Sequence, residues 1–213
     1  MNTLKKAIAG VALVAAGYAP VAGAVPLEFD LNNILNSGLP TDNNVIASFE
    51  NGLAGHVTLS MSLTSLLSTS DWLSQFYFNS NVNPSLLTIT PASGTPPVTI
   101  SQANWNLYSP GGDGNFDVLF QYSSAQADRF KNQTMATYDI YATTVPALTK
   151  ENFNSLSGAT SAPFYAAAAK VSGVWTTTAP VPEPETYAMM LVGLGLMGWM
   201  ARRRRQSLQP DPA

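Results

Sequence analysis

The chain has 213 residues, of which 11% are charged, and it contains no cysteine. Without cysteine there are no disulfide bonds and no thiolate metal sites, so a folded domain must be stabilised by packing alone. Positive charge lies mainly at the two ends, and residues 25–180 hold ten acidic and four basic side chains, a net charge of −6 that excludes the basic surface of a nucleic-acid-binding domain.

The first element, residues 1–24, is a predicted secretory signal peptide. Two lysines precede an apolar run of small residues, and Ala22 and Ala24 form an A-x-A cleavage site. We expect transfer through the Sec translocon and cleavage by signal peptidase, so that the mature chain begins at Val25. An uncleaved N-terminal anchor is the alternative, and Pro20 argues against it.

Residues 25–180 are long enough for one domain with its own core. Apolar and polar residues alternate over 57–63, 116–122 and 138–142, as in strands with one buried face. Shorter strands are predicted at 76–78, 86–90, 98–100, 105–108 and 166–171, and two stretches, 63–76 and 123–130, could be short helices. About eight short strands separated by Pro and Gly turns predict an all-β fold, an antiparallel β-sandwich of jelly-roll-like form.

One short loop has the oxygen ligands of a calcium site. Asp113, Asn115 and Asp117 match positions 1, 3 and 5 of a calcium-binding loop. Val118 stands where that loop needs glycine, and Ser124 stands where it needs a bidentate glutamate. The alternative is a Gly-rich hairpin turn in which Asp113 and Asn115 are the turn formers.

Residues that indicate catalysis are scarce. His56 is the only histidine, and although Ser60 and Asp71 are near it in sequence, there is no G-x-S-x-G motif. A surface or turn histidine is therefore favoured over a catalytic one, and one histidine without cysteine makes a zinc site implausible. A pair of carboxylates from distant strands could still serve glycoside hydrolysis, which the sequence does not exclude.

Aromatic side chains are numerous enough for a surface that stacks against sugars. They are Trp72, Phe76, Tyr77, Trp105, Tyr108, Tyr122, Tyr138, Tyr141, Tyr165 and Trp175. Core packing is the alternative use of such side chains. Tyr141 falls on the strand face opposite Tyr138 and Ile140, so we predict that it is the more exposed ring.

The C-terminal part begins with a stiff, acidic segment. Pro182, Glu183 and Pro184 lie in it, and the two prolines keep the backbone extended, which suits the groove of a protease or transpeptidase. Fifteen apolar residues, 187–201, follow and would span about 22 Å as a helix, against a bilayer core of about 30 Å.

Four arginines end this apolar stretch: Arg202, Arg203, Arg204 and Arg205. Their side chains can extend to the membrane interface, and positive residues remain on the cytoplasmic side. We therefore expect a short helix in the inner membrane with its C-terminus cytoplasmic and the domain outside. A core helix of a soluble domain with a basic tail is the alternative.

This order of segments resembles the PEP-CTERM exported proteins of Gram-negative bacteria. The resemblance rests on Pro182, Glu183 and Pro184, the apolar run and the arginine cluster, and it implies an exosortase as processing partner in bacteria that usually make exopolysaccharide. The segments are a signal peptide at 1–24, a secreted domain at 25–180, a sorting signal at 181–205 and a polar tail at 206–213. The tail is a departure from the family, which often ends sooner.

Parts of the domain resemble other PEP-CTERM exported domains. The segments 116–120, 148–157 and 163–167 carry this resemblance, but Ala169 and Lys170 stand where many such domains have His-Val. Three classes of function remain: an exported cell-surface or matrix protein without evident catalytic activity, a carbohydrate-binding or adhesive module for exopolysaccharide, and a secreted hydrolase. The first is the prediction, and the sequence suggests no cofactor apart from the candidate calcium.

Overall fold

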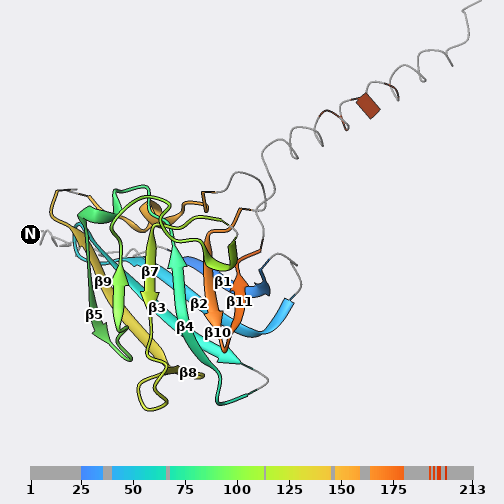
Figure 1. The fold of residues 1–213 in the computed structure, drawn as a ribbon. Coiled ribbons are helices and arrows are strands. Elements are labelled where there is room, and N and C mark those ends of the chain that lie inside the picture. The colour runs from blue at the N-terminus through green and yellow to red at the C-terminus, as the bar shows by residue number, and fades with distance from the viewer. Residues whose placement is uncertain are drawn as a thin grey trace, which may run out of the picture.

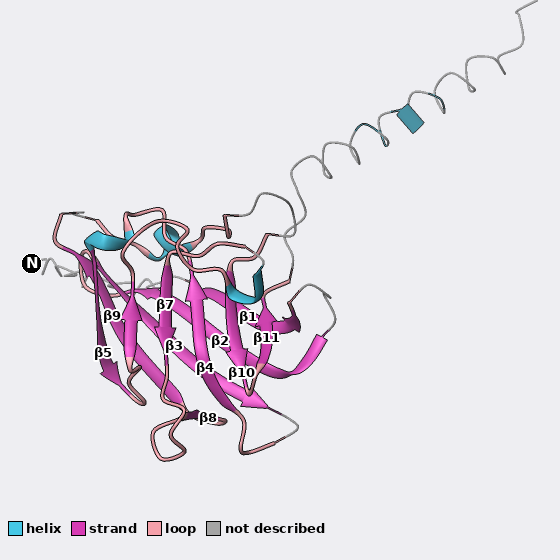
Figure 2. Ribbon diagram, in the orientation of Figure 1, coloured by secondary structure: helices cyan, strands magenta, loops and turns pink. Residues whose placement is uncertain are grey.

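The computed structural model describes residues 25–35, 40–65, 68–112, 114–144, 147–158 and 164–179, together with Val192, Leu194, Leu196, Met197 and Met200. The elements within these residues are β1 (Leu27–Ile34), β2 (Pro40–Asn51), β3 (His56–Ser65), β4 (Trp72–Phe78), η1 (Pro84–Leu86), β5 (Leu87–Ser93), β6 (Thr99–Ser101), η2 (Pro110–Gly112), β7 (Val118–Gln121), β8 (Phe130–Lys131), β9 (Met135–Ala142), η3 (Lys150–Phe153), β10 (Ala167–Val171) and β11 (Val174–Thr177). Loops and short 3-10 turns (η) connect the strands (Figure 2).

The described strands all belong to one antiparallel sheet (Figure 1). Its order is β5-β9-β3-β2-β1-β11-β10-β4-β7-β6, and β8 pairs with β4. The β1–β11 pairing joins two halves, β5-β9-β3-β2-β1 and β11-β10-β4-β7-β6. The inner faces of these halves pack together: Phe49 of β2 contacts Phe78 of β4 at 5.4 Å between ring centroids, and Phe120 of β7 contacts Tyr138 of β9 at 4.9 Å.

The prediction of an all-β, antiparallel fold is confirmed. We expected a jelly-roll-like sandwich of two sheets, whereas the strands form one continuous sheet that is nearly closed. The reason is β11, which pairs with β10 on one side and with β1 on the other. The two sheet edges, β5 and β6, are consecutive in the chain, and the Gln102 side-chain amide after β6 donates to the Leu87 carbonyl at the start of β5.

Apolar and polar residues alternate along β3 and β9, which explains why each strand lies with one face on the core. Val57, Leu59 and Leu63 are fully buried, whereas Thr58 and Ser60 between them are partly exposed. Such a pattern buries one strand face in the core and leaves the other at the surface. Phenylalanine rings fill much of this core, and each fully buried ring contributes about 1.5–3 kcal/mol. The fully buried ones in this core are Phe49, Phe76, Phe78, Phe120, Phe130 and Phe153.

A smaller apolar cluster lies on the outer face of the second half. Tyr77 of β4, Leu119 of β7 and Ala168 of β10 form its base, and Phe116 and Tyr165 from the connecting segments pack onto them. Phe76 and Phe78, the neighbours of Tyr77, lie in the main core, which identifies this face as the outer one. The connecting segments thus cover the end of this face that contains Tyr77.

Several predictions of elements were wrong. No helix forms over 63–76: its first residues end β3 and its last residues begin β4, and the described residues between them are turns or loop. Residues 123–129 form loop and turns and Phe130 begins β8, while 105–108 contribute one isolated bridge between Tyr108 and Phe116 instead of a strand. The strands β1, β2, β8 and β11 were not predicted.

Candidate functional site

The candidate calcium loop is tied into the fold by its backbone. Asp113 lies outside the described residues. The Asn115 N–H donates to the Gly158 carbonyl at 2.6 Å, and the Gly158 N–H returns a hydrogen bond at 2.9 Å. Asp117 follows as a buried residue, with 3% of its surface exposed.

Both carboxylate oxygens of Asp117 accept backbone hydrogen bonds. Oδ1 accepts from the Asn106 N–H at 2.7 Å, and Oδ2 accepts from the Ser80 N–H at 3.1 Å. The Asp117 N–H donates to Asn79 Oδ1 at 3.0 Å. This carboxylate therefore anchors the segment around Asn106 to the end of β4. Within the described ranges, no group of three or more His, Cys, Asp or Glu side chains could hold a metal ion, and the calcium loop stays a prediction.

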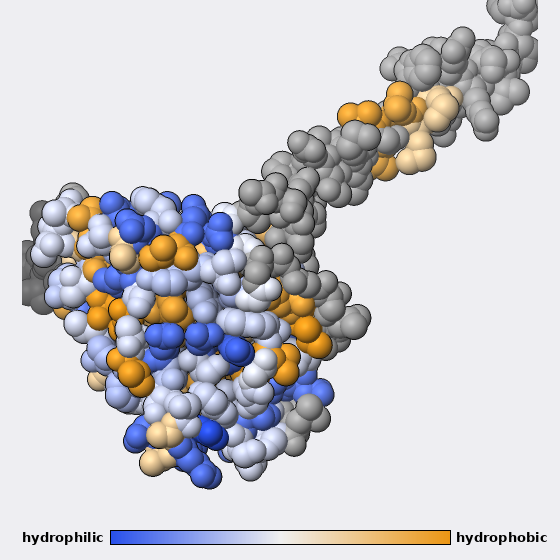
Figure 3. All heavy atoms as spheres, viewed as in Figure 1, coloured by the Kyte–Doolittle hydropathy of each residue, from blue (hydrophilic) through white to orange (hydrophobic). Residues whose placement is uncertain are grey.

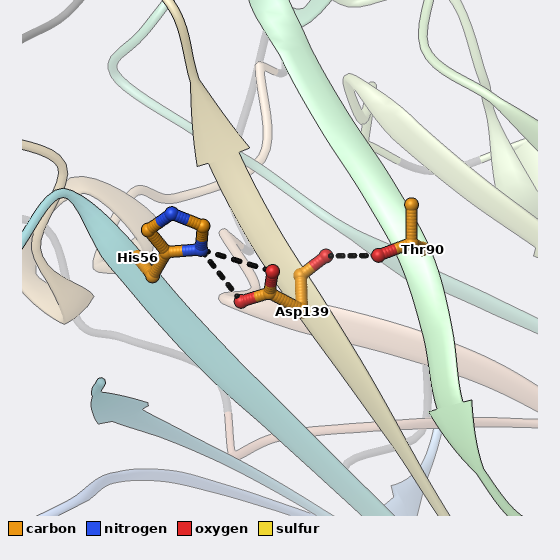
Figure 4. A network of polar contacts seen from close by, with 3 residues as sticks. All are labelled: His56, Thr90 and Asp139. Carbon is orange, nitrogen blue, oxygen red and sulfur yellow. Dashed lines mark hydrogen bonds and ion pairs between the residues drawn. The ribbon is translucent and has the colours of Figure 1, made fainter. Parts of the chain in front are cut away.

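A second polar group lies on the outer face of the first half (Figure 4). Nδ1 of His56 lies 2.9 and 3.0 Å from the two carboxylate oxygens of Asp139, and the imidazole stacks on Tyr141 with 4.9 Å between centroids. Thr90 Oγ1 donates to the Asp139 carbonyl at 3.5 Å. The strand register places these groups together, because His56 faces Tyr141 and Thr90 faces Asp139.

His56 occupies the partly exposed position that a surface histidine would have, at the start of β3. Among the described residues, no Ser, Thr or Tyr hydroxyl hydrogen-bonds to its ring. Tyr141 lies on the outer face, as predicted, whereas Tyr138 is fully buried. The arrangement is an exposed aromatic and carboxylate surface without an aligned nucleophile.

The outer face of the second half contains a cleft of about 400 Å³. Its lining residues are Trp72, Ser74, Gln75, Gln121, Tyr122, Ser124, Lys170 and Gly173. The register aligns Lys170 of β10, Gln75 of β4 and Gln121 of β7 in one row across the strands. Figure 3, which views this face, shows hydrophilic side chains in a band across the middle of the molecule.

A bulge in β4 shapes this cleft. Lys170 pairs with Gln75 and Val171 pairs with Leu73, so Ser74 is the extra residue, and its Oγ donates to the Lys170 carbonyl at 2.8 Å. The bulge allows Leu73 to reach the core and leaves Gln75 on the outer face. β-Bulges redirect side chains in this way and are frequent beside functional sites.

Two tryptophans are associated with cations at this cleft. The Arg129 guanidinium lies 4.6 Å from the centroid of the Trp72 ring, and Lys170 Nζ lies 5.0 Å from that of Trp175. The side-chain amides of Gln75 and Gln121 make no hydrogen bond to other described residues. The cleft therefore combines aromatic faces, available amides and a cation.

A second cleft, of about 460 Å³, lies beside the sheet edge between β5 and β6. Its lining residues are Thr95, Pro96, Pro97, Val98, Ser123, Ala127 and Asp128. It contains no aromatic ring and no basic side chain, so it offers fewer specific interactions than the cleft at Trp72.

The predicted aromatic surface is only partly present. Five of the ten rings are buried: Phe76, Tyr77, Tyr122, Tyr138 and Tyr165. The other five, Trp72, Trp105, Tyr108, Tyr141 and Trp175, are partly or fully exposed. Trp72 and Trp175 are the two rings that accompany the cations at the cleft, a grouping that strand register produces and sequence spacing does not show.

The predicted export residues lie outside the described residues: Ala22, Ala24, Pro182, Glu183, Pro184, Arg202, Arg203, Arg204 and Arg205. The five residues described between 192 and 200 are helical, and their side chains are 52–57% exposed. In the described part of the chain, no helix has both the length and the apolar composition of a membrane span.

Comparison with protein families identifies a PEP-CTERM protein-sorting motif at residues 180–205. The match contains the Pro-Glu-Pro segment, the apolar run and the four arginines, so the resemblance expected from the sequence is confirmed for this part of the chain. The match begins three positions after β11 ends at Thr177. No curated protein and no solved structure matches the chain.

Proposed function

We propose that this protein is an exported cell-surface or matrix-associated protein that an exosortase sorts and processes, and that its β domain acts by binding and not by catalysis. The observation that carries the proposal is the PEP-CTERM motif at 180–205, directly after the last strand of the domain. The motif supports export and exosortase-dependent sorting, and its position after β11 supports residues 25–180 as the delivered segment.

The proposed route follows from the physics of the two ends. The signal peptide directs the chain through the Sec translocon, and signal peptidase cleaves after Ala24. The apolar run then stops in the inner membrane, because the arginine cluster holds the C-terminus on the cytoplasmic side. The extended Pro-Glu-Pro segment lies just outside the bilayer, where the exosortase cleaves it and releases the domain to the surface.

Alanine replacement of the sorting triplet tests this route. Pro182, Glu183 and Pro184 are changed together, and the full chain is followed in a host that contains an exosortase. We expect uncleaved precursor to accumulate in the inner-membrane fraction. Pro210, Asp211 and Pro212 form a matched acidic triplet beyond the arginines. Their replacement by alanine should leave processing normal, whereas equal processing of both variants would refute the role of the motif.

The arrangement of His56, Asp139 and Tyr141 on the outer face supports a binding role for the domain instead of a catalytic one. The Nδ1 atom of the single histidine faces a carboxylate, and no described hydroxyl is aligned with its ring as a nucleophile. Both side chains are 37% exposed, so the pair is a surface interaction with a modest energy of at most about 1 kcal/mol.

A second candidate function, carbohydrate binding, is favoured by the cleft at Trp72. Sugars are bound by aromatic faces together with amide groups that donate to and accept from hydroxyls, and both groups are available there. Within this proposal the domain attaches to exopolysaccharide after its release from the membrane.

A further inference from the structure

We infer that the cleft lined by Trp72, Gln75, Gln121 and Lys170 binds an acidic polysaccharide through its carboxylate groups. The inference rests on the proposed binding function of the domain and specifies the ligand class for one site. Its volume of about 400 Å³ lies within the range of about 300–1,000 Å³ that ligand sites in proteins have.

The first step concerns the distribution of cations. Residues 25–180 have only four basic side chains; Lys170 lines this cleft, and Arg129 and Lys131 are neighbours of its Trp72. Lys170 lines it and Arg129 stacks on Trp72. Lys131 is paired opposite Trp72 in the β4–β8 ladder, so the two side chains project to the same face. Positive charge is thus concentrated at one site of an otherwise acidic domain.

The second step concerns the partners of these cations. The ion pairs of the described residues are His56–Asp139 and Lys150–Glu151, and neither includes a cation of the cleft. No Asp or Glu is among the lining residues of the cleft. Stacking on tryptophan holds a cation in place without neutralising its charge. The cleft cations are therefore available to a ligand carboxylate.

The third step concerns the groups that recognise a sugar. Gln75 and Gln121 lie next to each other across β4 and β7, and their amides are free to bind hydroxyls of a sugar ring. Trp72 lies beside this row, three positions before Gln75 on β4, and adds a partly exposed aromatic ring with Arg129 over one face. Sugars that carry carboxylates match this set, because one residue of such a polymer presents an apolar ring face, hydroxyls and a negative charge together.

Polygalacturonate and its methyl ester are suitable probes, because esterification removes the carboxylate charge and adds only one methyl group to each sugar residue. The full-length chain in detergent micelles is titrated with each polymer by calorimetry at low salt. We expect binding of polygalacturonate at least about tenfold tighter than binding of the ester, and weakening of that binding as salt is added. Equal binding of both polymers would overturn the inference and leave carbohydrate binding intact.

Two charge variants locate the site. Lys170→Gln should weaken the binding of polygalacturonate about tenfold, as expected for the loss of one charge contact. Lys150→Gln removes the same charge from η3, where Asn152 contacts Asn81 beyond the other end of β4, and should leave binding unchanged. If both variants weakened the binding of polygalacturonate equally, binding would reflect general electrostatic attraction. That result would overturn the assignment of the ligand to this cleft.

A third variant tests recognition of the sugar without any change of charge. Gln75→Ala should weaken binding while the thermal midpoint stays that of the wild-type chain, since the Gln75 amide makes no hydrogen bond to other described residues. If folded wild-type protein binds neither polymer, the inference fails together with the binding role. The sorting proposal is tested separately, because processing of the Lys170→Gln precursor should be normal.

Discussion

The hydroxyl groups of Tyr122 and Tyr138 lie 2.7 Å apart in the core. Tyr138 belongs to β9 in the first half of the sheet, and Tyr122 directly follows β7 in the second half. Tyr138 also donates to the Thr95 carbonyl at 3.3 Å, so Tyr122 must be the donor within the pair. This chain of hydrogen bonds connects the two halves close to the open edge of the sheet.

Replacement of these tyrosines by phenylalanine tests the connection. Tyr138→Phe should destabilise the domain by about 1–3 kcal/mol, because it leaves the Tyr122 hydroxyl and the Thr95 carbonyl without their partner. Tyr122→Phe should cost less, since Tyr138 keeps Thr95. The double variant should be more stable than the sum of the two single effects predicts, which urea unfolding measures. Strict additivity would mean that the hydroxyls are not coupled.

Alkaline pH provides a second test of the same pair. Burial raises the pKa of Tyr138 to about 12, and the hydrogen bond from Tyr122 acts in the opposite direction. Burial first, and then the interaction with Tyr138, raises the pKa of Tyr122 well above its ordinary value of 10.0.

The sign of the pH effect follows from these shifts. Below pH 10, both tyrosines are protonated in the folded and unfolded states, so their contribution to stability is fully present. Above pH 10, the unfolded chain loses protons that the folded chain retains, and stability falls by up to about 1.4 kcal/mol per pH unit for each tyrosine. Unfolding curves between pH 8 and 11 should show this decline, and the double phenylalanine variant should show less of it.

Two glycines with positive φ differ in their surroundings. Gly94 has φ +80°, and an added Cβ would lie 2.1 Å from the Met135 carbonyl oxygen and 2.7 Å from the Ala136 Cα. Gly173 has φ +92° and no neighbouring atom within 4 Å of an added Cβ. Gly173→Ala should therefore cost about 1–2 kcal/mol from backbone strain alone, whereas Gly94→Ala should cost more than about 3 kcal/mol. Thermal unfolding compares the two, and similar midpoints would contradict the close approach of β9 to Gly94.

Substitution of Asp117 distinguishes a structural role, in which its carboxylate anchors two backbone segments, from a role in binding calcium. Asp117→Asn should destabilise the domain by about 1–3 kcal/mol, because an amide supplies one acceptor where two backbone N–H groups need one each. Millimolar calcium should leave the thermal midpoint of both proteins unchanged, since the carboxylate is already occupied. A midpoint that rises with calcium in the wild-type chain but not in the variant would establish the calcium loop.

Sequence patterns located the strands with regular alternation. The segments 57–63 and 138–142 lie in β3 and β9, because their alternate residues pack on one core. The interpretation of 63–76 as helix was wrong for an identifiable reason: Leu73 and Phe76 are three positions apart and both buried, which suggests helical spacing. The bulge at Ser74 produces the same spacing in a strand.

The cleft could not be predicted, because it depends on register between strands that are distant in sequence. Gln75, Gln121 and Lys170 come from three elements, and nothing in their local sequence indicates that they are neighbours. The sorting motif was predictable for the opposite reason. Its function depends on local composition, with stiff prolines, an apolar run and a basic end all within 26 consecutive residues.

The position of β11 has a consequence for the order of folding during export. In the proposed export route the chain would enter the translocon from its N-terminus, so the segment Val174–Thr177 would be the last of the described strands to emerge. Until then, the strands that flank it have no partner for the edges they present, and two incomplete half-sheets are exposed to association with other chains. A C-terminal tail held in the membrane would keep each molecule apart from its neighbours during this interval. The membrane-anchored stage would therefore protect the protein from aggregation in addition to sorting it.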